Sequence, residues 1–142
     1  MSGYYRYFRE HRSAIDGFPD EGGIYGIRNR ATGRMYVGQT ASIRPRLLAH
    51  LSNLRGRRHI KLKLQMDWDN YGPDAFDWLV LELLPDCPKW LRRDIECKHI
   101  AIHQADQPWS GYNYCPPENW HVSMVGPRSD LLRRLRWLEL AP

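Results

Sequence analysis

Alternating and continuous apolar runs predict three strands along the chain. Residues 23–28 and 35–38 alternate weakly between apolar and polar positions, and turn residues separate them, with Gly33 expected at positive φ. These two runs therefore predict a hairpin. Residues 76–84 predict the clearest strand, because they are almost continuously apolar and are followed by Pro85 and Pro88.

Apolar residues at helical spacing predict four helices, at about 43–54, 60–70, 90–104 and 128–140. Ser42 is expected to cap the first helix, and Gly72 and Pro73 to end the second. The residues expected to face the core are, in chain order, Leu47, Leu51, Leu54, Leu62, Met66, Tyr71, Leu91, Ile95, Ile102, Leu131, Leu135 and Leu138. Residues 105–127 hold many prolines and glycines and are expected to be mostly loop.

The order β-β-α-α-β-α is typical of a small α/β (α+β) domain. We expect a three-stranded, mainly antiparallel sheet flanked by helices, with an extra C-terminal helix. A length of 142 residues suits one domain with its own core. The expected divisions are an N-terminal extension at 1–20, which ends in a turn-rich stretch, a domain at 21–115, and a C-terminal loop and basic amphipathic helix at 116–142.

Basic residues gather in two places. The chain has 21 Lys and Arg against 16 Asp and Glu, a net charge of +5. The two clusters are Arg44, Arg46, Arg55, Arg57, Arg58, Lys61 and Lys63, and then Arg133, Arg134 and Arg136. Such clusters favour a polyanionic partner through counterion release, and a merely solvated basic face is the alternative.

The sequence predicts an intracellular, cytoplasmic protein. No apolar run approaches the roughly 20 residues that span a bilayer, and the first residues lack the apolar stretch of a signal peptide. Cys87, Cys97 and Cys115 are odd in number and irregularly spaced, as in proteins with reduced thiols. A transition-metal site at Cys97, His99 and His103 is not expected, because no fourth ligand converges on it.

Two tyrosines on the predicted hairpin are candidates for proton transfer. A turn centred on Arg30 and Ala31 would place Tyr25 directly opposite Tyr36, on one face of the sheet. A phenol has a pKa of ~10, so it becomes a base near neutral pH only where cations stabilise the phenolate. The alternative is that both rings simply pack on the sheet.

Arg46 and His50 are four residues apart and project from the same face of a predicted helix. A guanidinium can hold a phosphate by two hydrogen bonds and stabilise the charge that builds on phosphorus. His59 lies in a basic run, where it is expected to contact a phosphate. For all three residues, an ordinary solvated surface position is the alternative.

Glu96 is the candidate metal ligand. It follows Ile95 on a helix with an apolar face, so it is expected at the sheet-side edge, partly buried. Mg²⁺ or Mn²⁺ prefers oxygen ligands, and one carboxylate together with phosphate oxygens is enough to hold it. A pair with a helical lysine is the alternative for Glu96. Asn113 is expected either to orient this carboxylate or to hold a chain terminus.

These residues together resemble the GIY-YIG nuclease superfamily over about residues 21–113. The resemblance rests on Gly23-Ile24-Tyr25, on Tyr36-Val37-Gly38, and on Arg46, His50, His59, Glu96 and Gly111-Tyr112-Asn113 in the family's order. It implies an endonuclease that hydrolyses DNA. It also implies Tyr25 as general base, Tyr36 on the phosphate or nucleophile, Arg46 on the transition state and His50 in proton transfer or phosphate positioning. Glu96 would hold a single Mg²⁺ or Mn²⁺.

The same resemblance implies further contacts with the substrate. The expected substrate-binding residues are Gly38, Arg44, His59, Lys61, Lys63 and Asn113. The partner is DNA, single- or double-stranded, bound by a monomer or a homodimer. A nucleic-acid-binding module that kept the fold and lost turnover is one alternative function, and a nuclease acting on RNA is another.

Overall fold

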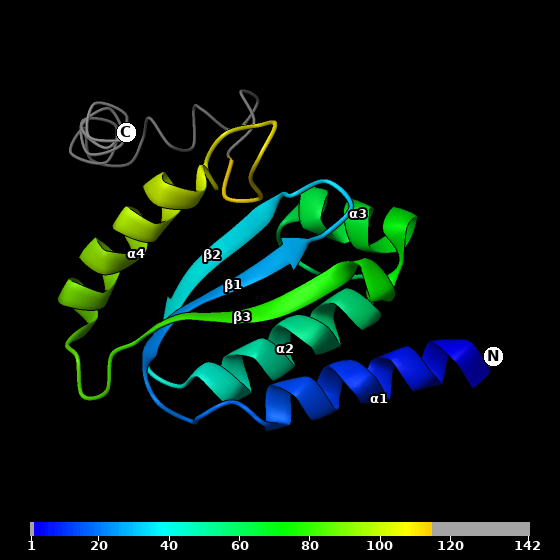
Figure 1. Cartoon of the computed structure of the whole chain (residues 1–142), viewed down its shortest axis with the longest axis horizontal. Coiled ribbons are helices and arrows are strands. Elements are labelled where there is room, and N and C mark those ends of the chain that lie inside the picture. Colours follow the sequence, from blue (N-terminus) through cyan, green and yellow to red (C-terminus); the bar gives the residue numbers. More distant parts are fainter. Residues whose placement is uncertain (1, 115–142) are drawn as a thin grey trace.

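The computed structural model describes residues 2–114 (Figure 1). The elements are α1 (Ser2–Asp16), β1 (Gly23–Asn29), β2 (Met35–Thr40), α2 (Ile43–Arg55), α3 (Leu62–Tyr71), a short 3-10 helix (Pro73–Ala75), β3 (Phe76–Leu83) and α4 (Lys89–His103). The predicted β-β-α-α-β-α order is confirmed, with α1 placed before it. The predicted helix at 128–140, Cys115 and the second basic cluster lie outside the described residues.

The sheet is antiparallel with strand order β2-β1-β3. Gly33 takes the expected positive φ of +77°. The predicted register is wrong by two residues: Tyr25 lies opposite Gly38, and Tyr36 lies opposite Ile27. The loop is longer than a two-residue turn, because Asn29 pairs with Arg34 and its side chain accepts a hydrogen bond from the Ala31 N–H at 2.9 Å. A shift of two residues keeps both tyrosines on one face.

Helices cover both faces of the sheet (Figure 1). On one face, α2 buries Leu47, Leu51 and Leu54 as predicted, against a core that includes Tyr25 and Trp78. On the other face, α4 packs over β2 and β1, where Ile24 and Val37 are buried. The hairpin is thus held between α2 and α4, and the tyrosine face points toward α2.

The helix α1 was not predicted from the sequence. It packs against α2 and β3, and Ile15 is fully buried in the main core. His11 accepts a hydrogen bond at its Nδ1 from the Trp78 indole N–H at 2.7 Å. Through His11 and Ile15, the predicted N-terminal extension therefore contributes to the core that supports the tyrosine face.

Two of the predicted helices bury different residues from those expected. In α3 the predicted inward residues Leu62, Met66 and Tyr71 are exposed, and the buried ones are Leu64, Gln65, Asp67 and Trp68. The prediction failed because it counted only apolar positions, whereas Gln65 and Asp67 are buried with hydrogen-bond partners.

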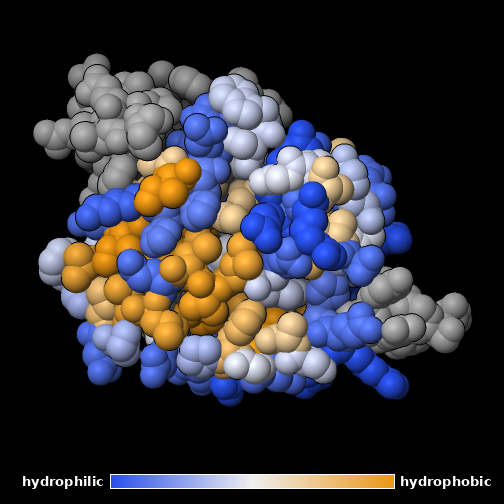
Figure 2. Space-filling model, in the orientation of Figure 1, coloured by the Kyte–Doolittle hydropathy of each residue, from blue (hydrophilic) through white to orange (hydrophobic). Residues whose placement is uncertain are grey.

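In α4 only Ile95 packs against the core as predicted, and Leu91 and Ile102 lie at the surface. Figure 2 shows apolar side chains gathered over the region of α4 and the adjoining strand, in agreement with the exposure of Ile102 and Leu83. The helix is amphipathic, but its apolar stripe is only partly covered by the sheet.

Other predicted features have mixed outcomes. Ser42 takes the N-cap position of α2, but its hydroxyl lies 2.7 Å from Asp20 Oδ1 and does not cap the helix. Cys87 and Cys97 are reduced, with no disulfide bond between them. Among the described residues, no helix is both long and apolar enough to span a bilayer.

Candidate active site

Two tyrosines and a histidine meet on the sheet face beneath α2. Tyr25 is 1% exposed, and its Oη lies 2.7 Å from His50 Nε2. The Tyr36 ring lies beside both, with centroids 6.3 Å from Tyr25 and 5.4 Å from His50. Tyr36 is half-buried, so it forms the more accessible part of this aromatic group.

Gly38 makes room for the Tyr25 ring. The two residues are cross-strand partners, and a Cβ built on Gly38 would lie less than 3.0 Å from Cζ and Oη of Tyr25. The absence of a side chain at Gly38 is therefore required for the Tyr25 ring to take its position. This is the role of Gly38 in the structure, whereas the sequence had placed it among substrate contacts.

Arg46 supplies the cation next to the phenols. It lies one helical turn before His50, on the exposed side of α2, and its side chain hydrogen-bonds with Tyr25. Burial raises the pKa of both Tyr25 and Tyr36, and Arg46 acts in the opposite direction on both. The guanidinium therefore favours phenolate at a place where burial disfavours it.

His59 lies directly behind His50. Their stacked rings have centroids 5.0 Å apart, and His50 Nδ1 lies 2.7 Å from His59 Nε2. Both rings are buried, at 4% and 7% exposure, so the solvated alternatives do not apply to them. Burial and the neighbouring cations lower the pKa of His50 to about 3 and that of His59 to about 4, so both are neutral near pH 7.

Glu96 approaches the same place from α4. It is half-buried, and burial raises the pKa of its carboxyl group, opposed by a hydrogen bond from the Gln39 backbone and by Arg93 and Lys61. The charge of Glu96 in turn raises the pKa of Tyr36. Side chains from β1, β2, α2 and α4, namely Tyr25, Tyr36, Arg46 and Glu96, thus interact around one site.

The donors present fit a divalent cation held mainly by the substrate. No group of three or more His, Cys, Asp or Glu side chains in the described part of the chain could hold a metal by itself. The single half-buried carboxylate of Glu96, which acts on Tyr36, remains. One carboxylate plus phosphate oxygens and water suits Mg²⁺ or Mn²⁺, which keep several waters.

Three of the expected substrate contacts are engaged elsewhere. Arg44 donates from Nε and Nη2 to the Phe18 carbonyl, at 3.0 and 2.6 Å. The Asn113 amide donates to the Val37 carbonyl and accepts from the Val37 N–H, both at 2.8 Å, which favours the structural alternative for this residue. Lys63 pairs with the buried Asp67 at 3.4 Å. Of the other expected contacts, Lys61 is half-exposed and acts on the Glu96 carboxylate.

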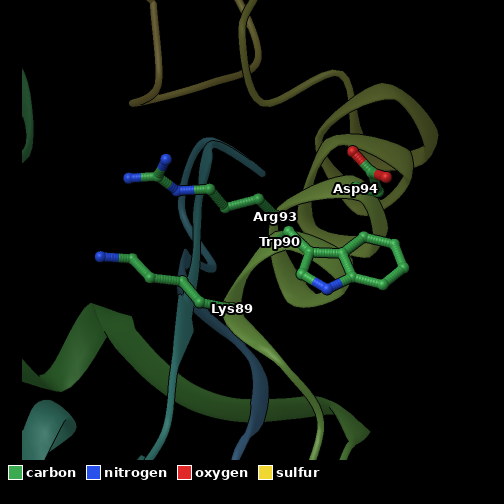
Figure 3. Close-up of a pocket in the computed structure, with 4 residues that line it drawn as sticks. All are labelled: Lys89, Trp90, Arg93 and Asp94. Atoms are coloured by element: carbon green, nitrogen blue, oxygen red, sulfur yellow. The ribbon is translucent and has the colours of Figure 1, made fainter.

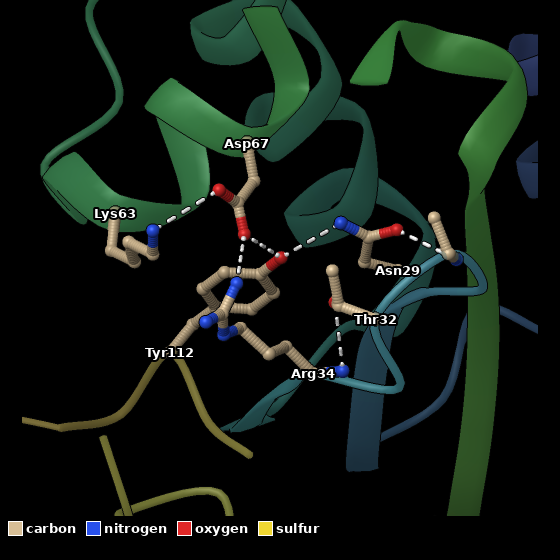
Figure 4. A network of polar contacts seen from close by, with 7 residues as sticks. Asn29, Thr32, Arg34, Lys63, Asp67 and Tyr112 are labelled. Carbon is tan, nitrogen blue, oxygen red and sulfur yellow. Dashed lines mark hydrogen bonds and ion pairs between the residues drawn. The ribbon is translucent and has the colours of Figure 1, made fainter. Parts of the chain in front are cut away.

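Asp67 is the centre of a buried polar network (Figure 4). Its carboxylate accepts a hydrogen bond from Tyr112 Oη at 2.7 Å and pairs with Arg34 at 3.2 Å. Asn29 donates to the same tyrosine oxygen at 3.3 Å. The network joins α3, the hairpin and the segment after α4, and so holds the β1–β2 hairpin next to the helices that carry the site.

Two cations on α4 were missed in the sequence. Lys89 and Arg93 are one helical turn apart and point the same way, and with Trp90 and Asp94 they line a hollow of about 420 Å³ (Figure 3). Arg93 precedes Glu96 by three residues and acts on its carboxylate. The signal was available, because residues three apart share a helix face.

Comparisons with known proteins agree with this geometry. Residues 21–86 match the family model of the GIY-YIG catalytic domain. The chain is 29% identical over 93 residues to Intron-associated endonuclease 1 of Enterobacteria phage T4, a match that covers 64% of this chain and 36% of that protein. This chain therefore spans little more than a third of the curated relative's length.

Two solved structures are similar to this fold. The catalytic domain of the homing endonuclease I-TevI matches with a TM-score of 0.58 and 27% identity, over 65% of this chain and 96% of that one. A mutant of the catalytic domain of intron endonuclease I-TevI matches with a TM-score of 0.56 and 27% identity, over 61% of this chain and 87% of that one. The signature tripeptides, the sheet topology and these likenesses agree, and residues 21–86 are similar in sequence and fold to the catalytic domain of the GIY-YIG nucleases.

Proposed function

We propose that this chain is a divalent-metal-dependent endonuclease that hydrolyses DNA phosphodiester bonds. The observation that carries the proposal is the meeting of Tyr25, Tyr36, Arg46 and Glu96, drawn from four elements, around one site. The similar proteins are themselves named endonucleases, which supports the reaction class. Because DNA is found inside cells, the proposal includes the intracellular location expected from the sequence.

Arg46 is proposed to hold the scissile phosphate. Its guanidinium is exposed, whereas the phenols behind it are largely buried, so a phosphate entering the site meets the cation first. Two parallel N–H donors can bind two phosphate oxygens and stabilise the extra charge of the transition state. The same contact brings phosphorus next to the two tyrosine hydroxyls.

Tyr25 is proposed to take the proton of the attacking water, with Tyr36 hydrogen-bonded to the phosphate or to that water. Burial alone would prevent this, because it raises the pKa of both phenols. Arg46 opposes the effect of burial, and a cation bound at Glu96 would add to it. A metal ion bound there would also polarise the phosphate and stabilise the leaving oxygen.

The basic residues around the site are proposed to contact the flanking phosphates. Lys61 lies on one side of Glu96, and Lys89 and Arg93 lie along α4 on the same helix as that carboxylate. Contacts of this kind give affinity without reading sequence. Affinity for DNA should therefore fall with added salt.

The test is cleavage of a supercoiled plasmid and of labelled oligonucleotides, with Mg²⁺, Mn²⁺ or a chelator present. Wild type is expected to cleave only with metal, and Glu96→Gln and Arg46→Ala to lose roughly 10²- to 10³-fold in rate. Glu82→Gln is the matched control. The Glu82 carboxylate pairs with His99, and none of the contacts described for it involves Tyr25 or Tyr36. Undiminished cleavage by Glu96→Gln, or cleavage by wild type in chelator, would refute the proposed metal-bound mechanism.

The same assay also determines which type of nucleic acid is the preferred substrate. Single-stranded, duplex, nicked and branched DNA are compared with RNA of the same sequence. Preference for RNA would replace DNA as the proposed substrate. Binding of DNA without cleavage, by wild type and variants alike, would instead identify a binding module that kept the fold.

A further inference from the structure

A chain of hydrogen bonds leads from the backbone of Lys61 to the Tyr25 phenol. The Lys61 N–H donates to His59 Nδ1 at 3.0 Å. His59 Nε2 lies 2.7 Å from His50 Nδ1, and His50 Nε2 lies 2.7 Å from Tyr25 Oη. Each imidazole nitrogen can be donor or acceptor, but a backbone N–H can only donate, so this end of the chain has a fixed direction.

That fixed end determines the tautomer of both rings. Because His59 Nδ1 accepts a hydrogen bond, the proton of the neutral ring is on Nε2. His59 Nε2 then donates to His50 Nδ1, which leaves the His50 proton on its own Nε2. His50 therefore donates to Tyr25 Oη. Burial keeps both rings neutral, as this assignment requires.

We propose that His59 is a positioning residue that fixes the tautomer of His50, so that His50 acts as a hydrogen-bond donor to Tyr25 and not as an acceptor of its proton. The tautomer assignment stands on the geometry alone. Its catalytic consequence rests on the proposed nuclease function, in which Tyr25 is the base.

The direction of the last hydrogen bond decides what Tyr25 can do. A donor aimed at Oη stabilises the phenolate and leaves the phenolic proton free to point away from His50, toward Tyr36. With the opposite tautomer, the Tyr25 proton would be bound to His50 Nε2, and Oη would lack that donor. His59 thus supports the same ionised form that Arg46 supports from the exposed side.

The turn between α2 and α3 holds His59 in this orientation. The His59 backbone N–H donates to Gln65 Oε1 at 3.1 Å. The side-chain amide of Gln65 in turn donates from its Nε2 to the Leu54 carbonyl at 3.0 Å. Gln65 is 6% exposed, which explains why a polar residue occupies the inner face of α3. The glutamine fixes the turn, and the turn presents the Lys61 N–H to the ring.

The direct test is NMR of the histidine rings in the protein near pH 7. Two-bond ¹H–¹⁵N spectra are expected to show, for both His50 and His59, a protonated Nε2 and an unprotonated Nδ1. A proton on Nδ1 of either ring would overturn the proposal. In His59→Phe, which keeps a ring against His50, the His50 tautomer is expected to become mixed. If His50 stays a pure Nε2–H form in that variant, His59 does not fix it.

Kinetics of two His59 variants separate this role from a purely structural one. A hydrogen bond to a charged group predicts that His59→Phe lowers kcat roughly 10- to 100-fold with little change in KM. His59→Gln, which can place an N–H donor near His50 Nδ1, is expected to recover much of that loss. Equal losses in the two variants, with equal loss of thermal stability, would overturn the positioning role.

The two proposals fail in different ways. The NMR result does not depend on cleavage, so it stands if the chain proves to be a binding module. Conversely, wild-type cleavage together with an Nδ1–H form of His50 would reject the positioning role of His59 and leave the nuclease proposal intact.

Discussion

Tyr25 has its position because its cross-strand neighbour has no side chain. The ring lies across Gly38, in space that any Cβ would fill. In the proposed mechanism Tyr25 must reach both His50 and the scissile phosphate, and it cannot move away from Gly38 without leaving one of them. Small displacements of this kind have large effects on rate, since a misplacement of about 1 Å can cost roughly 100-fold.

We therefore expect Gly38→Ala to reduce cleavage by roughly 100-fold while the chain still folds. Overpacking of this size typically costs about 1–3 kcal/mol of stability. Gly26→Ala is the control on the same hairpin, because its nearest neighbour is the flexible Met35 side chain at 3.3 Å. Initial cleavage rates and thermal melts of both variants test this, and wild-type rates in Gly38→Ala would contradict it.

At the residue scale, the sequence predicted which residue types meet but not which of them are free. Tyr25, Tyr36, Arg46 and Glu96 were identified from local spacing and from the family resemblance. Arg44 and Asn113 were expected to bind substrate, and both are engaged on backbone groups about 26 and 76 positions away. A local pattern contains no information about partners that only the tertiary fold brings close.

At the element scale, the strands and α2 were predictable because their buried positions are apolar and regularly spaced. The inner face of α3 was not predictable, because it carries the polar residues Gln65 and Asp67. These side chains can be buried since they have hydrogen-bond partners or ion pairs in α2, the hairpin and Tyr112. Among the side chains of α1 that the structure describes, those that enter the core are His11 and Ile15, which lie four residues apart and of which His11 is polar. Such faces are recognised only once their partners are known.

The polar network around Asp67 makes a prediction for the packing of these elements. Tyr112→Phe removes the donor to Asp67 and the acceptor of Asn29, and both of these partners are buried. We expect a loss of about 1–3 kcal/mol in the free energy of unfolding, measured by urea denaturation. Tyr71→Phe at the exposed end of α3 is the control, with a change within about 0.5 kcal/mol. Equal stability of the two variants would show that the network contributes nothing.

At the scale of the whole molecule, three buried neutral histidines predict acid sensitivity. Burial lowers the pKa of His11, and lowers those of His50 and His59 to about 3 and about 4. The unfolded chain takes up these protons near pH 6.5 and the folded chain does not, so stability is full above pH 6.5 and falls as the pH is lowered toward 4.

Each such histidine contributes a slope of up to about 1.4 kcal/mol per pH unit in that window. Urea midpoints at pH 7.5, 6.0 and 5.0 are expected to fall steadily, with the m-value unchanged. Loss of stability only below pH 4 would indicate that carboxylates, and not these rings, govern the transition. Equal midpoints at pH 7.5 and 5.0 would reject the prediction outright.

The order of the elements has a consequence for recognising active members of the family. Residues 21–86 carry the tripeptides and the arginine, but the carboxylate comes from α4, ten positions further along. A related chain could therefore satisfy the family pattern in full and still lack the acid, through substitution or loss of a single helix. In the proposed mechanism such a chain would lack the metal ligand, so one position in the helix after the third strand, beyond residues 21–86, would separate a nuclease from a binding module.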